Sequence, residues 1–270
     1  MPGRKPARRV HVGTSGWVYK DWCGVFYPDK LPATERFAYY AREFDVVEVN
    51  ATHYRLASPA MVANWNRVVP PGFRMVAKGS QFITHRLKLK NCEQAVERFF
   101  QPLAELRSLT CVLWQFSQVM PRDLGRLDAF LSLLPRHVRH AVEFRDRAWW
   151  ADDVFALLEK QRVALCAVSH PALPPDVVPT TDFLYARFHG LGEKLYDYDY
   201  SPKQLAEWAA RLRPHLRQRE LYAFFNNDWH CQAIRNAKSF RKLLAGTGER
   251  PGVVAAGGKR GAGARLRVHS

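Results

Sequence analysis

Polar and charged side chains stand two positions apart at the ends of several short apolar stretches of this sequence. The pairs are Glu48 and Asn50, Glu143 and Arg145, and Arg187 and His189. Successive side chains of a β-strand point to opposite faces, so residues two apart share a face. A carboxylate enclosed on such a face is costly unless a cation pairs with it. We therefore expect the two glutamates to face the cations that end other stretches, namely Lys78, Arg145 and Arg187.

This charge network has the groups for general acid–base chemistry, and we predict Glu48, Glu143 and His189 as catalytic residues. Each also has a structural alternative, because ion-pair networks and satisfied histidines occur in cores as well. Lys78 has two roles open to it. A desolvated lysine at a barrel end is a Schiff-base nucleophile, whereas a charged lysine anchors a phosphate or carboxylate group. We expect the anchor, because carboxylates stand nearby.

Further polar and aromatic residues end the same stretches and are predicted to bind substrate. The full predicted set is Thr14, Ser15, Trp17, Tyr19, Asn50, Tyr54, Lys78, Gln115, Arg145, Arg187, Asn226 and Asn227. The two asparagines are expected to orient His189. Whether a metal is bound stays open: Glu48, Glu143, His189 and His230 would supply ligands for a divalent metal, but they form no motif.

Eight β-branched or aromatic stretches must position these residues. They are Val10–Thr14, Asp45–Asn50, Phe73–Lys78, Cys111–Phe116, His140–Phe144, Val163–Val168, Phe183–Phe188 and Glu220–Phe225. Seven connections have apolar residues at helical spacing: Glu35–Phe44, Pro59–Val69, Cys92–Leu106, Leu124–Leu134, Asp152–Lys160, Pro202–Leu216 and Gln232–Leu244. Four prolines in Ser169–Asp182 argue against a helix there.

This alternation predicts a single-domain (β/α)8 barrel of the TIM type, with its site where the strands end. The rival is an open doubly wound sheet. It is disfavoured because Gly13-Thr14-Ser15-Gly16-Trp17, and no G-x-G-x-x-G motif, follows the first strand.

Composition places limits on the class of protein. No apolar stretch approaches the ~20 residues of a membrane span, so we expect no membrane association. The five cysteines are odd in number and scattered, which argues against a disulfide framework and a thiolate zinc site. We expect a cytoplasmic protein, and the oligomeric state stays open.

Half of the formal net charge of +16 lies near the two ends of the chain. Residues 1–9 contribute +4 and residues 246–270 another +4, which leaves +8 for residues 10–245. We predict a basic N-terminal tail, a barrel domain over 10–245, and a flexible Gly/Ala/Arg-rich tail over 246–270. Such tails attract nucleic acid or other anions without sequence specificity, or simply aid solubility.

Several blocks of the sequence resemble the bacterial and archaeal YecE-like family, labelled a domain of unknown function. The blocks include Gly13–Trp17, Val47–Asn50, Phe73–Lys78, Phe82–His85, Ala141–Arg145, Tyr185–Gly190 and Phe224–Asp228. The resemblance covers roughly residues 10–244 and implies a TIM barrel, but no agreed activity. Two departures concern the loops: Ser169-His170-Pro171 replaces an acidic residue before proline, and the loop starting at Gly190 is short.

Three functions remain open from the sequence. The first is an enzyme acting on a phosphorylated or nucleic-acid-derived substrate, which the strand-end charges favour. The second is a nucleic-acid-binding module that uses the basic tails and exposed aromatic residues. The third is a sugar isomerase or hydrolase with paired carboxylates, for which the separation of Glu48 and Glu143 would decide the mechanism.

Overall fold

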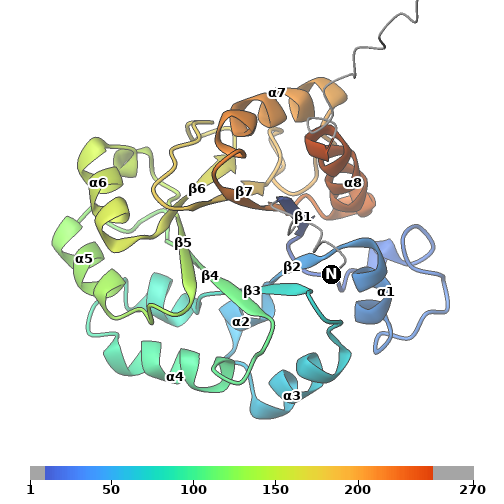
Figure 1. Cartoon of the computed structure of the whole chain (residues 1–270), viewed down its shortest axis with the longest axis horizontal. Helices are drawn as coiled ribbons and strands as arrows, with labels where there is room; N and C mark the ends of the chain where they lie inside the picture. Colours follow the sequence, from blue (N-terminus) through green and yellow to red (C-terminus); the bar gives the residue numbers. More distant parts are fainter. Residues whose placement is uncertain (1–9, 246–270) are drawn as a thin grey trace, which may run out of the picture.

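The β-branched and aromatic stretches form eight parallel strands in a computed structural model that describes residues 10–245. The strands are β1 (Val10–Thr14), β2 (Val46–Val49), β3 (Arg74–Lys78), β4 (Leu109–Gln115), β5 (Arg139–Glu143), β6 (Ala164–Ser169), β7 (Phe183–Phe188) and β8 (Glu220–Phe225). They form a ring with helices outside it (Figure 1). The predicted TIM-type barrel is confirmed, and every strand lies within two residues of its predicted bounds. The predicted tails, 1–9 and 246–270, lie outside the described residues.

Eight helices connect or follow the strands. They are α1 (Arg36–Glu43), α2 (Ala51–Tyr54), α3 (Pro59–Val68), α4 (Glu93–Leu103), α5 (Leu124–Ser132), α6 (Asp152–Gln161), α7 (Pro202–Leu212) and α8 (Gln232–Ala245). Shorter turns are η1 (Lys20–Trp22), the π-helical η2 (Phe82–Arg86), η3 (Arg147–Trp149), η4 (Arg213–His215) and η5 (Trp229–Cys231). As the prolines predicted, the structure has no helix between β6 and β7.

The ring closes between β1 and β2 by a short seam. The hydrogen-bonded strand order runs from β1 through β8, β7, β6, β5, β4 and β3 to β2. A bridge between Ser15 and Glu48 joins the two ends, and the Gly16 amide donates to the Glu48 carbonyl at 2.7 Å. A Cβ on Gly13 would lie 2.3 Å from the Val46 carbonyl oxygen, so only glycine permits this close approach. The seam brings Ser15 beside Glu48 at the open end of the barrel.

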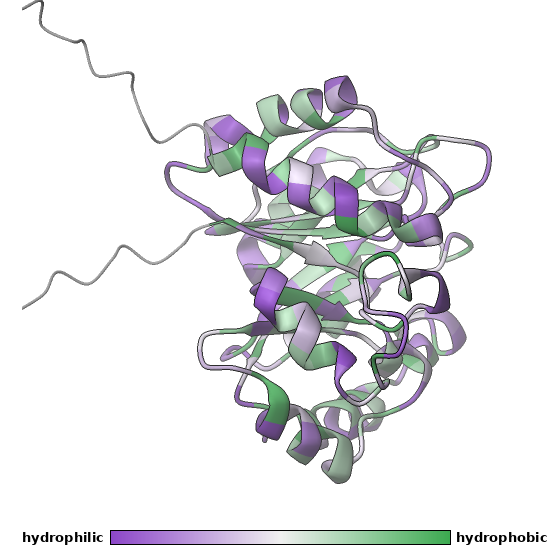
Figure 2. Ribbon diagram, turned by 90° about the vertical axis from the view of Figure 1, so that its right-hand side faces the viewer, coloured by the Kyte–Doolittle hydropathy of each residue, from purple (hydrophilic) through white to green (hydrophobic). Residues whose placement is uncertain are grey.

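Apolar side chains fill two regions, one on each face of the strands. Between strands and helices lies a large aromatic core that includes Trp114, Phe116 and Trp149. Inside the barrel lies a smaller cluster that includes Val76 and Tyr185. Figure 2 shows the apolar strands enclosed by helices that carry their hydrophilic residues outward. Because the inward side chains follow every second residue, the layer above this cluster consists of the polar strand ends.

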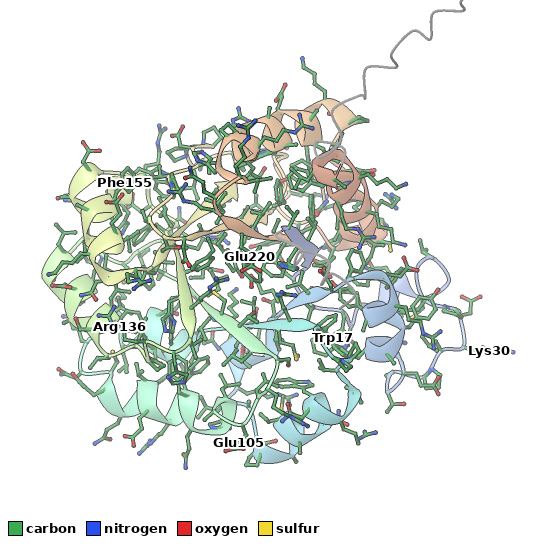
Figure 3. The ribbon with its side chains drawn as sticks, viewed as in Figure 1. Trp17, Lys30, Glu105, Arg136, Phe155 and Glu220 are labelled. Carbon is green, nitrogen blue, oxygen red and sulfur yellow. The ribbon has the colours of Figure 1, made fainter. Side chains whose placement is uncertain are left out.

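A second polar layer closes the amino-terminal end of the barrel. His11 on β1 lies 2.8 Å from Asp45 and 2.9 Å from Glu220. Glu220 also pairs with Arg139, and it is labelled near the centre of the ring in Figure 3. These ion pairs join the starts of β1, β5 and β8, so the barrel is charged at both ends and apolar between them.

Two further predictions concern the class of the protein. Within residues 10–245, no helix is both long enough and apolar enough to cross a membrane. All five cysteines are free, and all but Cys23 are buried.

Candidate functional site at the mouth of the barrel

A buried arginine forms the centre of the polar layer at the carboxyl ends of the strands. Arg187 lies on β7, two residues after the inward Tyr185, and its side chain is fully enclosed. Its Nη2 lies 2.7 Å from Glu48 Oε1, and its Nη1 lies 2.6 Å from Glu143 Oε2. Tyr185 donates to the second oxygen of Glu48 at 2.5 Å. One guanidinium thus holds both predicted catalytic glutamates.

The surroundings of Glu143 keep it ionised. Burial alone would raise the pKa of this carboxyl, but the charges of Arg145 and Arg187 outweigh burial and hold the pKa well below its usual range. Arg145 forms an ion pair with Glu143 Oε1 from the loop after β5. Since Glu143 has no exposed surface and accepts bonds on both oxygens, its role in the free protein is to fix the two arginines.

His189 links this ionic cluster to the rim. Its Nε2 lies 3.2 Å from Glu143 Oε1, and its Nδ1 lies 3.1 Å from the Asn226 side-chain nitrogen. Burial lowers the pKa of the imidazole to about 3, so the ring is neutral at physiological pH. Nε2 also lies 3.2 Å from Arg145 Nη2 and 3.3 Å from Arg187 Nη1, so the tautomer decides whether Nε2 donates to Glu143 or accepts from an arginine. Asn226 is only partly buried and therefore carries this chain of bonds toward solvent.

Lys78 is the one cation of the mouth, among the described residues, whose side chain has neither an ion pair nor a hydrogen bond. It ends β3 and is 8% exposed. Burial, followed by the charge of Arg187, lowers the pKa of its amine to about 7, although Glu48 and Glu143 oppose the shift. The histidines beside it, His53 and His85, have lowered pKa values for the same two reasons, burial and a nearby cation.

The part of the rim that follows β8, β1 and β2 carries neutral and acidic groups. Asn50 donates to the Ser15 carbonyl at 3.3 Å, and the Tyr19 hydroxyl donates to the same oxygen. Asp228 follows β8, and burial together with the nearby Asp21 raises the pKa of its carboxyl to about 6. The mouth therefore has a cationic side around Lys78 and a side of hydroxyl, amide and carboxyl groups.

The structure brings together eight of the predicted site residues. They are Ser15, Glu48, Lys78, Glu143, Arg145, Arg187, His189 and Asn226. Tyr19 and Asn50 adjoin them through Ser15. Ser15 Oγ itself lies 3.4 Å from the Arg187 guanidinium.

The other predicted residues lie apart from this cluster. Thr14 donates to the Tyr40 hydroxyl at 3.0 Å, so it faces α1. Asn227 bonds to the Tyr198 carbonyl and to Asn236, which fixes the loop before α7 against α8. Trp17 packs edge-on against Phe37, and Tyr54 is 69% exposed. Gln115 is the exception, because it is the register partner of Glu143 and follows the inward Leu113 by two residues, so it faces the mouth. His230, the fourth candidate metal ligand, is exposed on η5.

Four residues of the site were not predicted from the sequence. The two-residue spacing could have identified Tyr185, because this residue precedes Arg187 by two positions on the same strand. His53 and His85 lie on α2 and η2, where strand spacing gives no signal. Asp228 follows a pair of asparagines in a loop. For metals, residues 10–245 contain no group of three or more histidine, cysteine or acidic side chains placed to hold an ion.

Comparisons with known proteins agree with one another. A family model described as "Protein of unknown function DUF72" matches residues 11–258. A solved DUF72 family protein from Thermotoga maritima is 32% identical, with a TM-score of 0.78, over 88% of this chain and 100% of its own. Another from Enterococcus faecalis is 20% identical, with a TM-score of 0.75, over 87% of this chain and 95% of its own.

Curated sequence relatives bear the name UPF0759. The YunF protein of Bacillus subtilis is 22% identical over 87% of this chain and 94% of its own length. The YecE protein of Escherichia coli is 29% identical over 53% of this chain and 50% of its own length. These matches confirm the resemblance found in the sequence blocks.

Proposed function

The chain belongs to the DUF72 family, and from the chemistry of its barrel mouth we propose that it is an enzyme. Its substrate is a phosphorylated or nucleic-acid-derived compound, and the phosphate group of this substrate binds at the mouth. Lys78 and Arg145 are the groups that contact the phosphate. Arg187 sets the position of Arg145 through the shared Glu143.

The unpaired amine of Lys78 is the observation that carries this proposal. Three cations, Lys78, Arg145 and Arg187, face the two carboxylates of Glu48 and Glu143, so one positive charge is not balanced. Both carboxylates bond to Arg187, and the Lys78 amine forms no ion pair within residues 10–245. Lys78 is largely buried, but its amine nitrogen is not one of the fully enclosed polar atoms without a partner, so it still reaches solvent. A bound phosphate would give this largely desolvated cation a counter-ion.

The rest of the site suits a substrate larger than phosphate itself. Amide and hydroxyl groups of Asn226, Asn50 and Tyr19 provide donors and acceptors for sugar or base hydroxyls. Asp228 has a pKa near 6 and Lys78 a pKa near 7, which are the values that efficient proton transfer at neutral pH requires. The catalytic roles of Glu48, Glu143 and His189 stay predictions, and their enclosure favours the positioning of other groups.

Sulfate is a suitable first probe, because its charge is constant near neutral pH. We expect calorimetry at pH 6.5 to detect sulfate and phosphate binding, and Lys78→Met to weaken it about tenfold, which corresponds to ~1.4 kcal/mol. Lys160→Met removes an exposed lysine on α6 and serves as the matched control. Binding of sulfate should weaken as pH rises above about 7, where the Lys78 amine loses its proton.

The pH dependence involves every charged group that surrounds the amine. These are Glu48, Glu143, Arg145, Arg187, His53 and His85. His53 and His85 have lowered pKa values, so they are already neutral at pH 6.5 and do not contribute to the loss of sulfate affinity above pH 7. Equal sulfate affinity in the wild type and Lys78→Met would refute the proposed phosphate site.

A further inference from the structure

We propose that Lys78 is also a nucleophile that forms a Schiff base with the carbonyl group of a phosphorylated aldehyde or ketone. This inference rests on the proposed function for the phosphate and adds the chemical class of the substrate. Arg145 contacts the phosphate while the neutral Lys78 amine attacks the carbonyl carbon, and the iminium nitrogen then restores the positive charge at Lys78. It starts from the position of the amine at the mouth, from the rigid backbone beneath it, and from the lack of any partner for its nitrogen among the described residues.

The backbone of Lys78 is held on both sides. Its amide donates to Thr52 Oγ1 at 3.0 Å, and Thr52 donates back to its carbonyl at 2.8 Å. The next residue, Gly79, donates to the Leu113 carbonyl, and a Cβ there would lie 2.2 Å from the Trp114 ring. His53 also hydrogen-bonds the Gly79 carbonyl at 2.7 Å. A side chain on so fixed a base presents its amine in a defined direction, as nucleophilic catalysis requires.

The charges around the amine favour its neutral form. Arg187 and Arg145 favour the neutral amine, whereas Glu48 and Glu143 favour the protonated amine. His53 and His85 are neutral at pH 7, because their pKa values are lowered. With the pKa near 7, about half of the Lys78 amines are neutral at pH 7, whereas a lysine with a pKa of ~10.4 is neutral in fewer than ~1 in 10³ molecules. The neutral amine is the nucleophile.

The reaction balances without a further reactant. The nitrogen lone pair forms a bond to the carbonyl carbon, the carbonyl π electrons move to oxygen, and the proton lost from nitrogen is taken up by that oxygen. The resulting carbinolamine then takes one proton from solvent at the rim and releases water. The carbon–oxygen bond breaks as the nitrogen lone pair forms the C=N bond of the iminium ion. The negative charges of Glu48 and Glu143 stabilise this cation.

Reductive trapping tests the inference on the unmodified full chain. Glycolaldehyde phosphate and glycolaldehyde are the two probes, sodium borohydride reduces any imine, and peptide mass spectrometry locates the adduct. We expect Lys78 to be modified at least about tenfold faster than the exposed Lys160 at pH 7. Inorganic phosphate should slow the reaction of the phosphorylated probe. Loss of the adduct in Lys78→Arg, with the Lys160 adduct unchanged, would support the assignment.

The outcomes separate the two proposals. If sulfate and phosphate bind but Lys78 reacts no faster than Lys160 with either probe, the Schiff-base inference is overturned and the phosphate site stands. If both probes modify Lys78 at equal rates that phosphate does not affect, the nucleophile stands and the phosphate site fails. Rapid modification of Lys78 that phosphate slows for the phosphorylated probe supports both.

Discussion

The single Arg187 guanidinium neutralises two enclosed carboxylates. Replacing it with methionine keeps most of the volume but leaves Glu48 and Glu143 without their shared cation. We expect Arg187→Met to lower the free energy of unfolding by about 3–5 kcal/mol, as measured by urea denaturation. Arg235→Met, which breaks the exposed pair with Asp199, should cost no more than about 1 kcal/mol.

A triple variant separates the charge effect from a packing effect. Adding Glu48→Gln and Glu143→Gln to Arg187→Met removes the charge of Glu48, which then has no ion pair, and that of Glu143, which keeps only Arg145, so part of the lost stability should return. If the triple variant is less stable than Arg187→Met alone, the cost arises from packing and the ionic account is wrong.

The pKa pattern divides the residues of the mouth into two groups. Glu143 and His189 have pKa values far from neutrality, so each keeps one protonation state at pH 7. Lys78 and Asp228 have pKa values near 7 and 6, and a small change in their surroundings alters their charge. Substrate binding is such a change. The residues with a fixed protonation state therefore build the site, and those with pKa values near neutrality are suited to respond to substrate.

At the level of the elements, the sequence contained enough to predict the barrel. Each strand is a short β-branched or aromatic stretch, and the two-residue spacing of Glu143 and Arg145 or Arg187 and His189 places them at one end of the ring. The same rule explains two of the differences. Thr14 and Ser15 are adjacent, as are Asn226 and Asn227, so only one of each pair can face the mouth.

The remaining parts of the site lie where spacing gives no signal. Helix α2 has four residues and η2 has five, which is too short for a helical period to show. Yet these two turns bring His53 and His85 to Lys78, and Thr52 of α2 fixes its backbone. Loop conformation depends on tertiary contacts, so only the structure could show that these residues lie beside Lys78.

The amino-terminal end of the barrel gives a prediction about pH. Burial alone would lower the pKa of His11, but its hydrogen bonds to Asp45 and Glu220 outweigh burial and raise the pKa above the usual value of about 6.5. A histidine with a raised folded-state pKa contributes stability that is complete below the unfolded-state value and is lost as pH rises through the folded-state value. The free energy of unfolding should therefore fall as pH rises above about 6.5.

Urea denaturation between pH 6 and pH 9 measures this effect. His11→Asn should be less stable than the wild type at pH 6, and the difference should shrink toward pH 9. His137→Asn, on an exposed loop, should keep the pH dependence of the wild type. An unchanged slope in His11→Asn would show that other groups are responsible.

At the scale of the whole molecule, two regions of positive charge differ in kind, and the rest of the +8 of residues 10–245 lies outside both. One is the mouth of the barrel, where the excess is a single unbalanced cation held among enclosed residues. The other is the pair of chain ends, residues 1–9 and 246–270, which together carry +8 of the net +16. A pocket charge selects a small anion by geometry, whereas charges spread along a chain attract a polyanion by counterion release.

Because the mouth and the chain ends are separate, removing the chain ends should affect sulfate binding and DNA binding differently. A chain shortened to residues 10–245 should keep its sulfate affinity, because every residue of the mouth is retained. Its binding to a short duplex DNA, measured by fluorescence anisotropy, should weaken strongly, and the dependence on salt should become shallower, because each lost phosphate contact removes about 0.9 from the log–log slope. If the shortened chain binds DNA as tightly and with the same salt slope, the polyanion contacts lie on the barrel. If Lys78→Met in this shortened chain also weakened DNA binding, a nucleic-acid phosphate would be the natural occupant of the Lys78 site.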